Sequence, residues 1–203
     1  MILGAANDDA VSLDDVRRLI DEVERLRRLV EEYELRIGEL DRLAHRDALV
    51  GLPNRRSFLA NLERLISRGN RYGGQGAVIF VDLDGLKSIN DRFGHKAGDE
   101  ALIEVSKLLV QSVRSSDLVA RLAGDEFGIL LEQTDELGAW QTALRVIEAV
   151  DDCEFSAEGV CLPLSVAVGV AVIEPNDQCS DVLARADKEM YRIKAMGCPN
   201  PPR

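Results

Sequence analysis

Two short apolar runs separated by a polar break place the strongest constraint on the fold of this chain. The runs cover residues 118–122 and 127–131 and have the length and character of β-strands. The break between them consists of Ala123, Gly124, Asp125 and Glu126. This break predicts a tight β-hairpin, in which we expect Gly124 to adopt a positive φ. Two adjacent carboxylates beside nearly bare backbone indicate either a solvated acidic tip or half of a metal–phosphate site, which requires hard oxygen ligands.

A second predicted strand also ends in carboxylates. Residues 77–81 are apolar and predict a buried strand, and Asp82 and Asp84 follow at its end. Ligands commonly bind at strand ends in α/β sheets. These carboxylates therefore belong either to a ligand site or to a simple strand-terminating turn.

Polar side chains farther along could recognise a base. Asn90 and Asp99 could hydrogen-bond to the edge of a purine, although for Asp99 alone the simpler role is to cap a helix that we expect to end near residue 113. Before the first strand, Asn54 is expected to cap a helix over residues 55–67, and a flexible glycine-containing loop is expected over residues 68–76.

Composition limits the class of protein. The chain has 203 residues, enough for one domain with an appendage, and a formal net charge of −11. That charge argues against a general nucleic-acid binder, but a divalent cation could still join acidic residues to a nucleotide. No membrane span or signal peptide is expected, so the predicted location is cytoplasmic. The four cysteines form no CxxC pattern and suggest neither zinc nor a disulfide framework.

A heptad repeat covers residues 12–46. Apolar residues fall seven apart in two series, which are Val16, Val23, Val30, Ile37 and Ala44 at a, and Leu19, Leu26, Tyr33 and Leu40 at d. This pattern favours a parallel two-stranded coiled coil, and a single amphipathic helix packed on its own domain is the alternative. Charges at g and e, such as Glu22 with Arg27 of a second helix, fit the parallel dimer. We expect residues 1–11 to be a disordered lead-in and residues 47–203 to be the globular domain.

Five motifs together resemble the GGDEF family of diguanylate cyclases over about residues 45–200. They are Asp47-Ala-Leu-Val-Gly-Leu-Pro-Asn-Arg, Asp82-Leu-Asp-Gly-Leu-Lys-Ser-Ile-Asn-Asp, Phe93-Gly-His-Lys-Ala-Gly-Asp, Arg121-Leu-Ala-Gly-Asp-Glu-Phe and Ala186-Asp-Lys-Glu-Met-Tyr-Arg-Ile-Lys. The resemblance implies an α+β fold related to nucleotide cyclases and polymerase palm domains, with a central, mostly antiparallel sheet flanked by helices. It also implies that two domains of a homodimer join two GTP molecules into cyclic di-GMP and release two pyrophosphates.

The resemblance assigns roles to individual residues. Asp82, Asp125 and Glu126 would be catalytic, and with the carbonyl of Leu83 they would bind Mg²⁺ or Mn²⁺. Asn90 and Asp99 would recognise guanine, and Lys87 and Lys194 would contact phosphates. Leu86, Ala123 and Gly124 would line the substrate site.

The resemblance also implies an inhibitory site, and two residues of this chain that bear on nucleotide binding differ from the family pattern. Arg114 and Asp117 match the RxxD site at which product binds, and Arg145 would support it. Ala123 stands where the family usually has the first motif glycine, and Cys198 stands where it usually has a phosphate-binding arginine. The alternative function is therefore a catalytically silent GGDEF domain that binds cyclic di-GMP as a receptor. Neither a nucleic acid nor a membrane is expected as a partner.

Overall fold

The structure is a computed structural model that describes residues 13–195. The predicted lead-in of residues 1–11 and Cys198 therefore lie outside the described residues. Internal contacts divide the chain into two units, Met1–Ala44 and His45–Arg203. The predicted domain boundary, between residues 46 and 47, lies two residues after this division.

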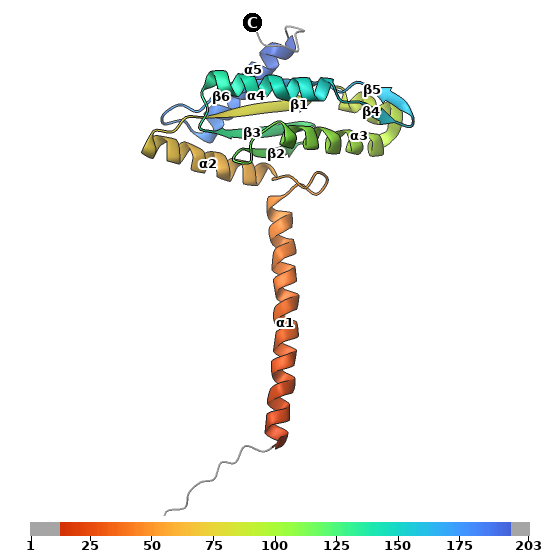
Figure 1. Ribbon diagram of the computed structural model, residues 1–203, viewed down its shortest axis with the longest axis vertical. Coiled ribbons are helices and arrows are strands. Elements are labelled where there is room, and N and C mark those ends of the chain that lie inside the picture. Colours follow the sequence, from red (N-terminus) through yellow and green to blue (C-terminus); the bar gives the residue numbers. More distant parts are fainter. Residues whose placement is uncertain (1–12, 196–203) are drawn as a thin grey trace, which may run out of the picture. The chain divides into compact units, whose positions relative to one another are not determined.

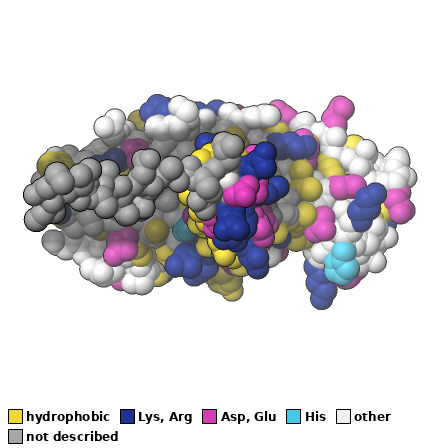
Figure 2. Space-filling model, turned by 90° about the horizontal axis from the view of Figure 1, so that it is seen from below, with side chains coloured by type: hydrophobic (Ala, Val, Ile, Leu, Met, Phe, Trp, Pro, Cys, Tyr) yellow, Lys and Arg dark blue, Asp and Glu magenta, His cyan; other side chains and the backbone are white. Residues whose placement is uncertain are grey.

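The first unit is formed by α1 (Leu13–His45), a single helix over the predicted heptads. Its apolar a and d side chains from Val16 to Leu40 are all exposed in the single chain, between 41% and 68%. Charged side chains of both signs are interspersed with apolar ones over the face seen in Figure 2. None of the helices within residues 13–195 has the length and apolar character needed to cross a bilayer.

The second unit is built on a four-stranded sheet with the order β2-β3-β1-β6 (Figure 1). All neighbouring strands in this sheet are antiparallel, which confirms the predicted α+β class. The helices are α2 (Arg55–Tyr72), α3 (Leu86–Gln111), α4 (Glu136–Asp151) and α5 (Cys179–Ala195). The strands are β1 (Gly76–Leu83), β2 (Leu118–Ala123), β3 (Glu126–Glu132) and β6 (Val166–Val172), and a small hairpin joins β4 (Phe155–Ala157) to β5 (Val160–Leu162).

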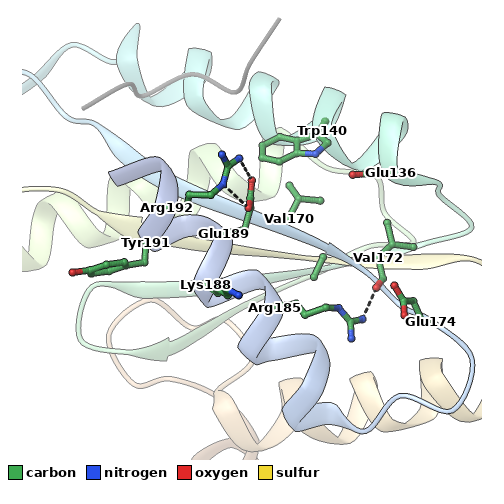
Figure 3. A pocket seen from close by; sticks show the side chains of 11 residues that line it. Glu136, Trp140, Val170, Val172, Glu174, Arg185, Lys188, Glu189, Tyr191 and Arg192 are labelled. Carbon is green, nitrogen blue, oxygen red and sulfur yellow. Dashed lines mark hydrogen bonds and ion pairs between the residues drawn. The ribbon is translucent and has the colours of Figure 1, made fainter. Parts of the chain in front are cut away.

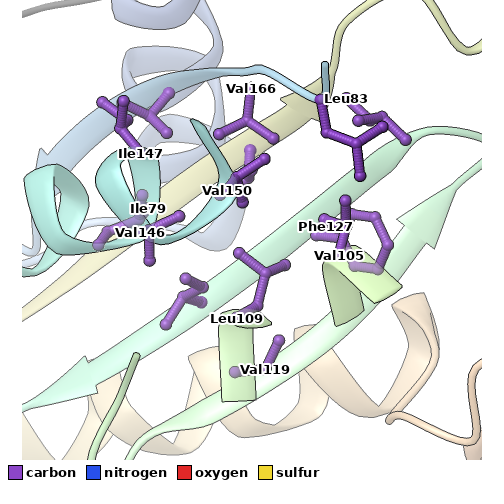
Figure 4. Packing of buried hydrophobic residues seen from close by; sticks show 14 of the residues in the cluster. Ile79, Leu83, Val105, Leu109, Val119, Phe127, Val146, Ile147, Val150 and Val166 are labelled. Atoms are coloured by element: carbon purple, nitrogen blue, oxygen red, sulfur yellow. The ribbon is translucent and has the colours of Figure 1, made fainter. Parts of the chain in front are cut away.

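Side chains of the central strand β1 enter two apolar layers in alternation. Ile79 and Leu83 join the layer beneath α3 and α4, which Figure 4 shows in close-up. Val78 and Phe80 join the opposite layer, with residues of α2 and α5. Successive residues of a strand point to opposite faces, so a strand covered on both sides must be apolar throughout. This burial fixes β1 in the middle of the sheet and determines where its C-terminal carboxylates lie.

The close packing of α5 against the sheet depends on a glycine. A Cβ atom at Gly169 of β6 would lie 2.5 Å from the amide nitrogen of Met190 and would also clash with the carbonyl oxygen of Ala186. Because both of these atoms belong to the backbone of α5, only glycine allows the helix to approach β6 this closely. This approach determines the position of Lys194 near the end of α5.

The predicted cap of α2 is confirmed, but the predicted end of α2, the predicted loop after it and the capping role of Asp99 are wrong. The Asn54 side chain caps α2 by accepting a hydrogen bond from the Ser57 amide, as expected, but α2 continues to Tyr72 and shortens the predicted loop. Asp99 does not cap a helix, because α3 runs from Leu86 to Gln111 with a break at Gly94, where φ is 82°.

Gly124 does not adopt the positive φ that the hairpin pattern predicts. The β2–β3 pairing instead contains a register shift between Arg121 and Ala123. Such an irregularity increases the local twist of the strands. The hairpin can therefore close without a left-handed residue at its tip.

Candidate functional site

The sheet brings three predicted carboxylates to one end. Asp82, near the C-terminus of β1, is the register partner of Glu126 at the start of β3. The Leu83 amide donates a 3.0 Å hydrogen bond to the carbonyl oxygen of Asp125. The two acidic strand ends recognised in the sequence are thus neighbours in the folded chain.

Lys194 reaches these carboxylates from α5. Its Nζ atom lies 2.5 Å from Oδ1 of Asp82 and 3.3 Å from Oδ1 of Asp84. The Ser165 hydroxyl donates to the other carboxylate oxygen of Asp84 at 3.2 Å. The resemblance assigns Lys194 to the binding of phosphate. In the free chain, this lysine instead binds acidic side chains.

The electrostatics of this end of the sheet reflect crowding of like charges. Partial burial raises the pKa of Glu126, and the negative charges of Asp82 and Asp125 raise it further. Burial by itself lowers the pKa of Lys194, but its hydrogen bonds and charge attraction to Asp82 and then Asp84 outweigh burial and raise that pKa. An additional cation would relieve the repulsion that Glu126 experiences.

The donor set fits a magnesium ion that is completed by substrate. Within residues 13–195, there is no group of three or more His, Cys, Asp or Glu side chains that could hold a metal ion without further ligands. Magnesium usually takes only one or two protein carboxylates and fills its other positions with water and substrate phosphates. Asp82 and Asp125 supply such carboxylates. In the free chain, the Lys194 ammonium group supplies the positive charge beside Asp82.

The break in α3 places the two predicted guanine-recognising residues close together. A Cβ atom at Gly98 would clash with Oδ1 of Asn90 and lie 2.9 Å from its Cγ, so the Asn90 side chain lies against Gly98. Asp99 follows directly in the chain and is exposed. Lys87, in the first turn of α3, is also exposed, and Leu86 is half-buried.

Two residues that sequence reasoning did not assign to the site hold the acidic turn. Arg121 donates to the carbonyl oxygen of Gly124 from Nε at 3.0 Å and from Nη2 at 2.7 Å. Its Nη1 atom lies 3.1 Å from Oδ1 of Asp47. Both residues belong to the recognised motifs, but 74 positions separate them, so their pairing was not apparent from the sequence.

The predicted inhibitory residues form a compact turn between α3 and β2. The Arg114 amide donates to Oδ2 of Asp117 at 3.0 Å, and the Arg114 side chain is exposed. Nε of Arg145 donates to the carbonyl oxygen of Ser112 at 2.7 Å, which holds this arginine beside the turn. A pocket of about 540 Å³ adjoins the turn and includes Arg114 and Asp117 in its lining.

Another pocket, of about 670 Å³, lies between α4 and α5 along β6 (Figure 3). Trp140 of α4 lines one side, and Arg192 of α5, which is paired with Glu189, lines the other. None of the predicted site residues lines this pocket. The predicted catalytic and substrate-binding residues lie instead at the acidic end of the sheet and along α3.

Comparisons with known proteins agree with this arrangement. Residues 44–199 match the family model described as "Diguanylate cyclase, GGDEF domain". The probable diguanylate cyclase DgcE of Escherichia coli K12 is 38% identical over 169 residues, which cover 83% of this chain and 15% of DgcE. The chain spans only 15% to 41% of the length of the first curated relatives it matches.

Solved structures show the same fold. Diguanylate cyclase SiaD of Pseudomonas aeruginosa, solved with its activator SiaC, superposes with a TM-score of 0.74 and 29% identity over 92% of this chain and 74% of that one. The coiled coil and GGDEF domain of DgcB from Caulobacter crescentus, in complex with c-di-GMP, superposes with a TM-score of 0.80 and 24% identity over 91% of this chain and 96% of that one. From the matched family model and the sheet that carries its motifs, we conclude that this chain belongs to the diguanylate cyclase GGDEF domain family.

Proposed function

We propose that this chain is a diguanylate cyclase that condenses two GTP molecules into cyclic di-GMP and two pyrophosphates across a homodimer. The observation that carries this proposal is the meeting of Asp82, Asp125 and Glu126 at one end of the sheet, with Lys194 beside them. The curated relatives that are named diguanylate cyclases support the same reaction.

The acidic residues would hold Mg²⁺ or Mn²⁺ together with the substrate phosphates. We assign the Asp82 and Asp125 carboxylates and the Leu83 carbonyl as ligands, with Glu126 as a further ligand or as the group that receives the proton. The bound ion would lower the pKa of the attacking 3′-hydroxyl and neutralise charge on the phosphates.

Residues of α3 and α5 would bind the remainder of GTP. The Asn90 amide can both donate and accept, and the Asp99 carboxylate accepts, which suits the polar edge of guanine. Lys87 and Lys194 would contact phosphates, so Lys194 exchanges its contact with Asp82 for one with the substrate. Leu86, Ala123 and Gly124 would lie against the nucleotide; a Cβ atom at Gly124 would meet no other atom in the free chain, which leaves room there.

The reaction requires two domains, because one site supplies one GTP. The exposed apolar stripe of α1 would be buried in a parallel coiled coil, with Glu22 beside Arg27 and Arg36 beside Asp41 of the partner helix. In the single chain Glu22 pairs with Arg25 of its own helix at 2.8 Å. Joining the helices would hold two half-sites at a high effective concentration.

Product would inhibit the enzyme at Arg114 and Asp117, supported by Arg145. The exposed guanidinium of Arg114 is available to a phosphate or a guanine edge. A silent domain that binds cyclic di-GMP at this turn is the alternative function. Two residues favour it, Ala123 in place of the usual glycine and Cys198 in place of the usual arginine.

The dependence on the dimer is tested by a pair of matched substitutions on α1. Leu26→Asp puts a charge into the proposed seam at a d position, and Leu35→Asp makes the same change at an f position outside it. We expect Leu26→Asp to convert the dimer to a monomer by light scattering and to abolish cyclic di-GMP formation at micromolar protein. Leu35→Asp is expected to retain both properties. Full activity from a monomeric Leu26→Asp variant would contradict the proposal.

A further inference from the structure

We propose that Arg121 is a positioning residue that makes the geometry of the acidic turn depend on the linking loop, which we define as residues 46–54. This inference rests on the proposed function for its catalytic consequence, but its structural part can be tested without turnover. The guanidinium of Arg121 lies between the loop and the turn, and its side chain is only 14% exposed.

Both peptide groups that flank Asp125 are held by hydrogen bonds. The carbonyl oxygen of Gly124 accepts from two nitrogens of Arg121, at 3.0 Å and 2.7 Å. The carbonyl oxygen of Asp125 accepts from the Leu83 amide at 3.0 Å. Because these peptide groups lie on either side of one Cα atom, the two contacts together restrict the direction of the Cα–Cβ bond of Asp125. A carboxylate at the tip of an exposed turn would otherwise sample several orientations.

The two contacts differ in what supports them. Leu83 belongs to β1, which is buried on both faces and paired along both edges. Arg121 is held from outside the hairpin by Asp47, which is 24% exposed. One side of the turn therefore rests on the sheet, and the other rests on a loop that directly follows the end of α1.

Asp47 organises the linking loop as well as binding Arg121. Its Oδ1 atom accepts the amides of Leu49 and Val50, both at 3.0 Å, and also the guanidinium of Arg121 at 3.1 Å. The loop contacts β2 a second time, where the Arg121 amide donates to the carbonyl oxygen of Pro53 at 3.0 Å. A change in the loop must therefore act at both the backbone and the side chain of Arg121.

The planar guanidinium makes this coupling stiff. Its nitrogens share one rigid plane, so the Nη1 contact to Asp47 and the Nε and Nη2 contacts to Gly124 cannot move independently. Displacement of Asp47 rotates or releases the group that holds the Gly124 carbonyl. The expected consequence is a misdirected Asp125 and a kcat that falls by a larger factor than the KM for GTP rises, because Arg121 does not contact Asn90 or Asp99, the residues assigned to guanine.

Amide hydrogen exchange of the chain of residues 1–203 without nucleotide tests the structural part. Arg121→Lys keeps the charge but cannot make all three contacts, and Asp47→Asn keeps an oxygen for the loop amides but loses the ion pair. Charge-assisted hydrogen bonds of this kind predict about 10- to 100-fold faster exchange of the Leu83 amide in Arg121→Lys. We expect a smaller acceleration at Leu83 in Asp47→Asn, together with faster exchange of the Arg121 amide.

A matched control and a double variant make the outcome decisive. Arg185→Lys disrupts another arginine–aspartate pair, with Asp177 at 2.6 Å, and is expected to leave exchange at Leu83 unchanged. The double variant Asp47→Asn/Arg121→Lys is expected to exchange no faster at Leu83 than Arg121→Lys alone, because both changes act through one contact. Faster exchange at residue 121 with wild-type exchange at Leu83 in Asp47→Asn would overturn the coupling.

Turnover then separates this inference from the proposed function. If the wild type forms cyclic di-GMP, Asp47→Asn is expected to lower kcat more than it raises KM. The reverse pattern would overturn the catalytic part of the inference. If the wild type forms no product, the proposed function fails, and the exchange rates at Leu83 still decide whether the loop positions the turn.

Discussion

Gly169→Ala tests the packing that positions α5 and Lys194. A Cβ atom there would lie 2.5 Å from the Met190 amide nitrogen, whereas real Cβ atoms essentially never approach another heavy atom within 3.0 Å. The helix must therefore move by at least 0.5 Å at Met190, and by more at the carbonyl of Ala186. Because these atoms are backbone, no rotamer change can relieve the clash. Overpacking of this kind costs about 1–3 kcal/mol, or a decrease in Tm of roughly 2–12 °C for a domain of this size.

Thermal unfolding followed by circular dichroism measures this effect. Gly74→Ala is the matched control, because a Cβ atom there meets nothing within 4 Å and its φ is not positive. We expect Gly74→Ala to unfold within about 1 °C of the wild type, since exposed sites without special geometry tolerate substitution. An equal Tm for Gly169→Ala and the wild type would show that α5 does not pack on β6 as closely as described.

Three further predictions concern the site. Gly98→Ala displaces the Asn90 side chain but not the backbone, so we expect an unchanged Tm. The KM for GTP is expected to rise about 10-fold, as for one lost hydrogen bond. An unchanged KM would show that Asn90 does not recognise guanine. In metal-free buffer, Glu126→Gln is expected to raise Tm at pH 7–8, because the raised pKa means that ionised Glu126 opposes folding. This gain should vanish below about pH 4, where the carboxyl is protonated in both states, and a gain independent of pH would contradict it. Arg114→Ala should leave the initial rate intact and prevent its decline as product accumulates; retained inhibition would remove the second site.

Features encoded by local pattern were predictable from the sequence. The apolar run at residues 77–81 and the two runs around Asp125 became strands of one sheet, since runs of this length between turn residues are typical of buried strands and too short for most helices. The cap at Asn54 was likewise predictable, because its mechanism involves only the next three residues.

Features that depend on tertiary contacts were not predictable. The conformation of Gly124 is set by a register shift and by Arg121, not by the dipeptide at the tip. The pairing of Lys194 with Asp82 joins residues 112 positions apart, so no local pattern indicated that this lysine neutralises carboxylates in the free chain. The helix α3 begins at Leu86 and resumes after a break at Gly94, so Asp99 lies inside a helix and not at its start. A glycine in the sequence does not show where a helix resumes after such a break.

The most direct measurement is incubation of the purified chain with GTP and Mg²⁺, with products separated by chromatography and identified by mass. We expect cyclic di-GMP and pyrophosphate from the wild type and neither from Asp125→Ala. This variant loses a proposed metal ligand at an exposed turn and should remain a folded dimer. Equal product from Asp125→Ala would contradict the assigned site. No product from the wild type, with tight binding of added cyclic di-GMP, would contradict the enzyme and identify a receptor instead.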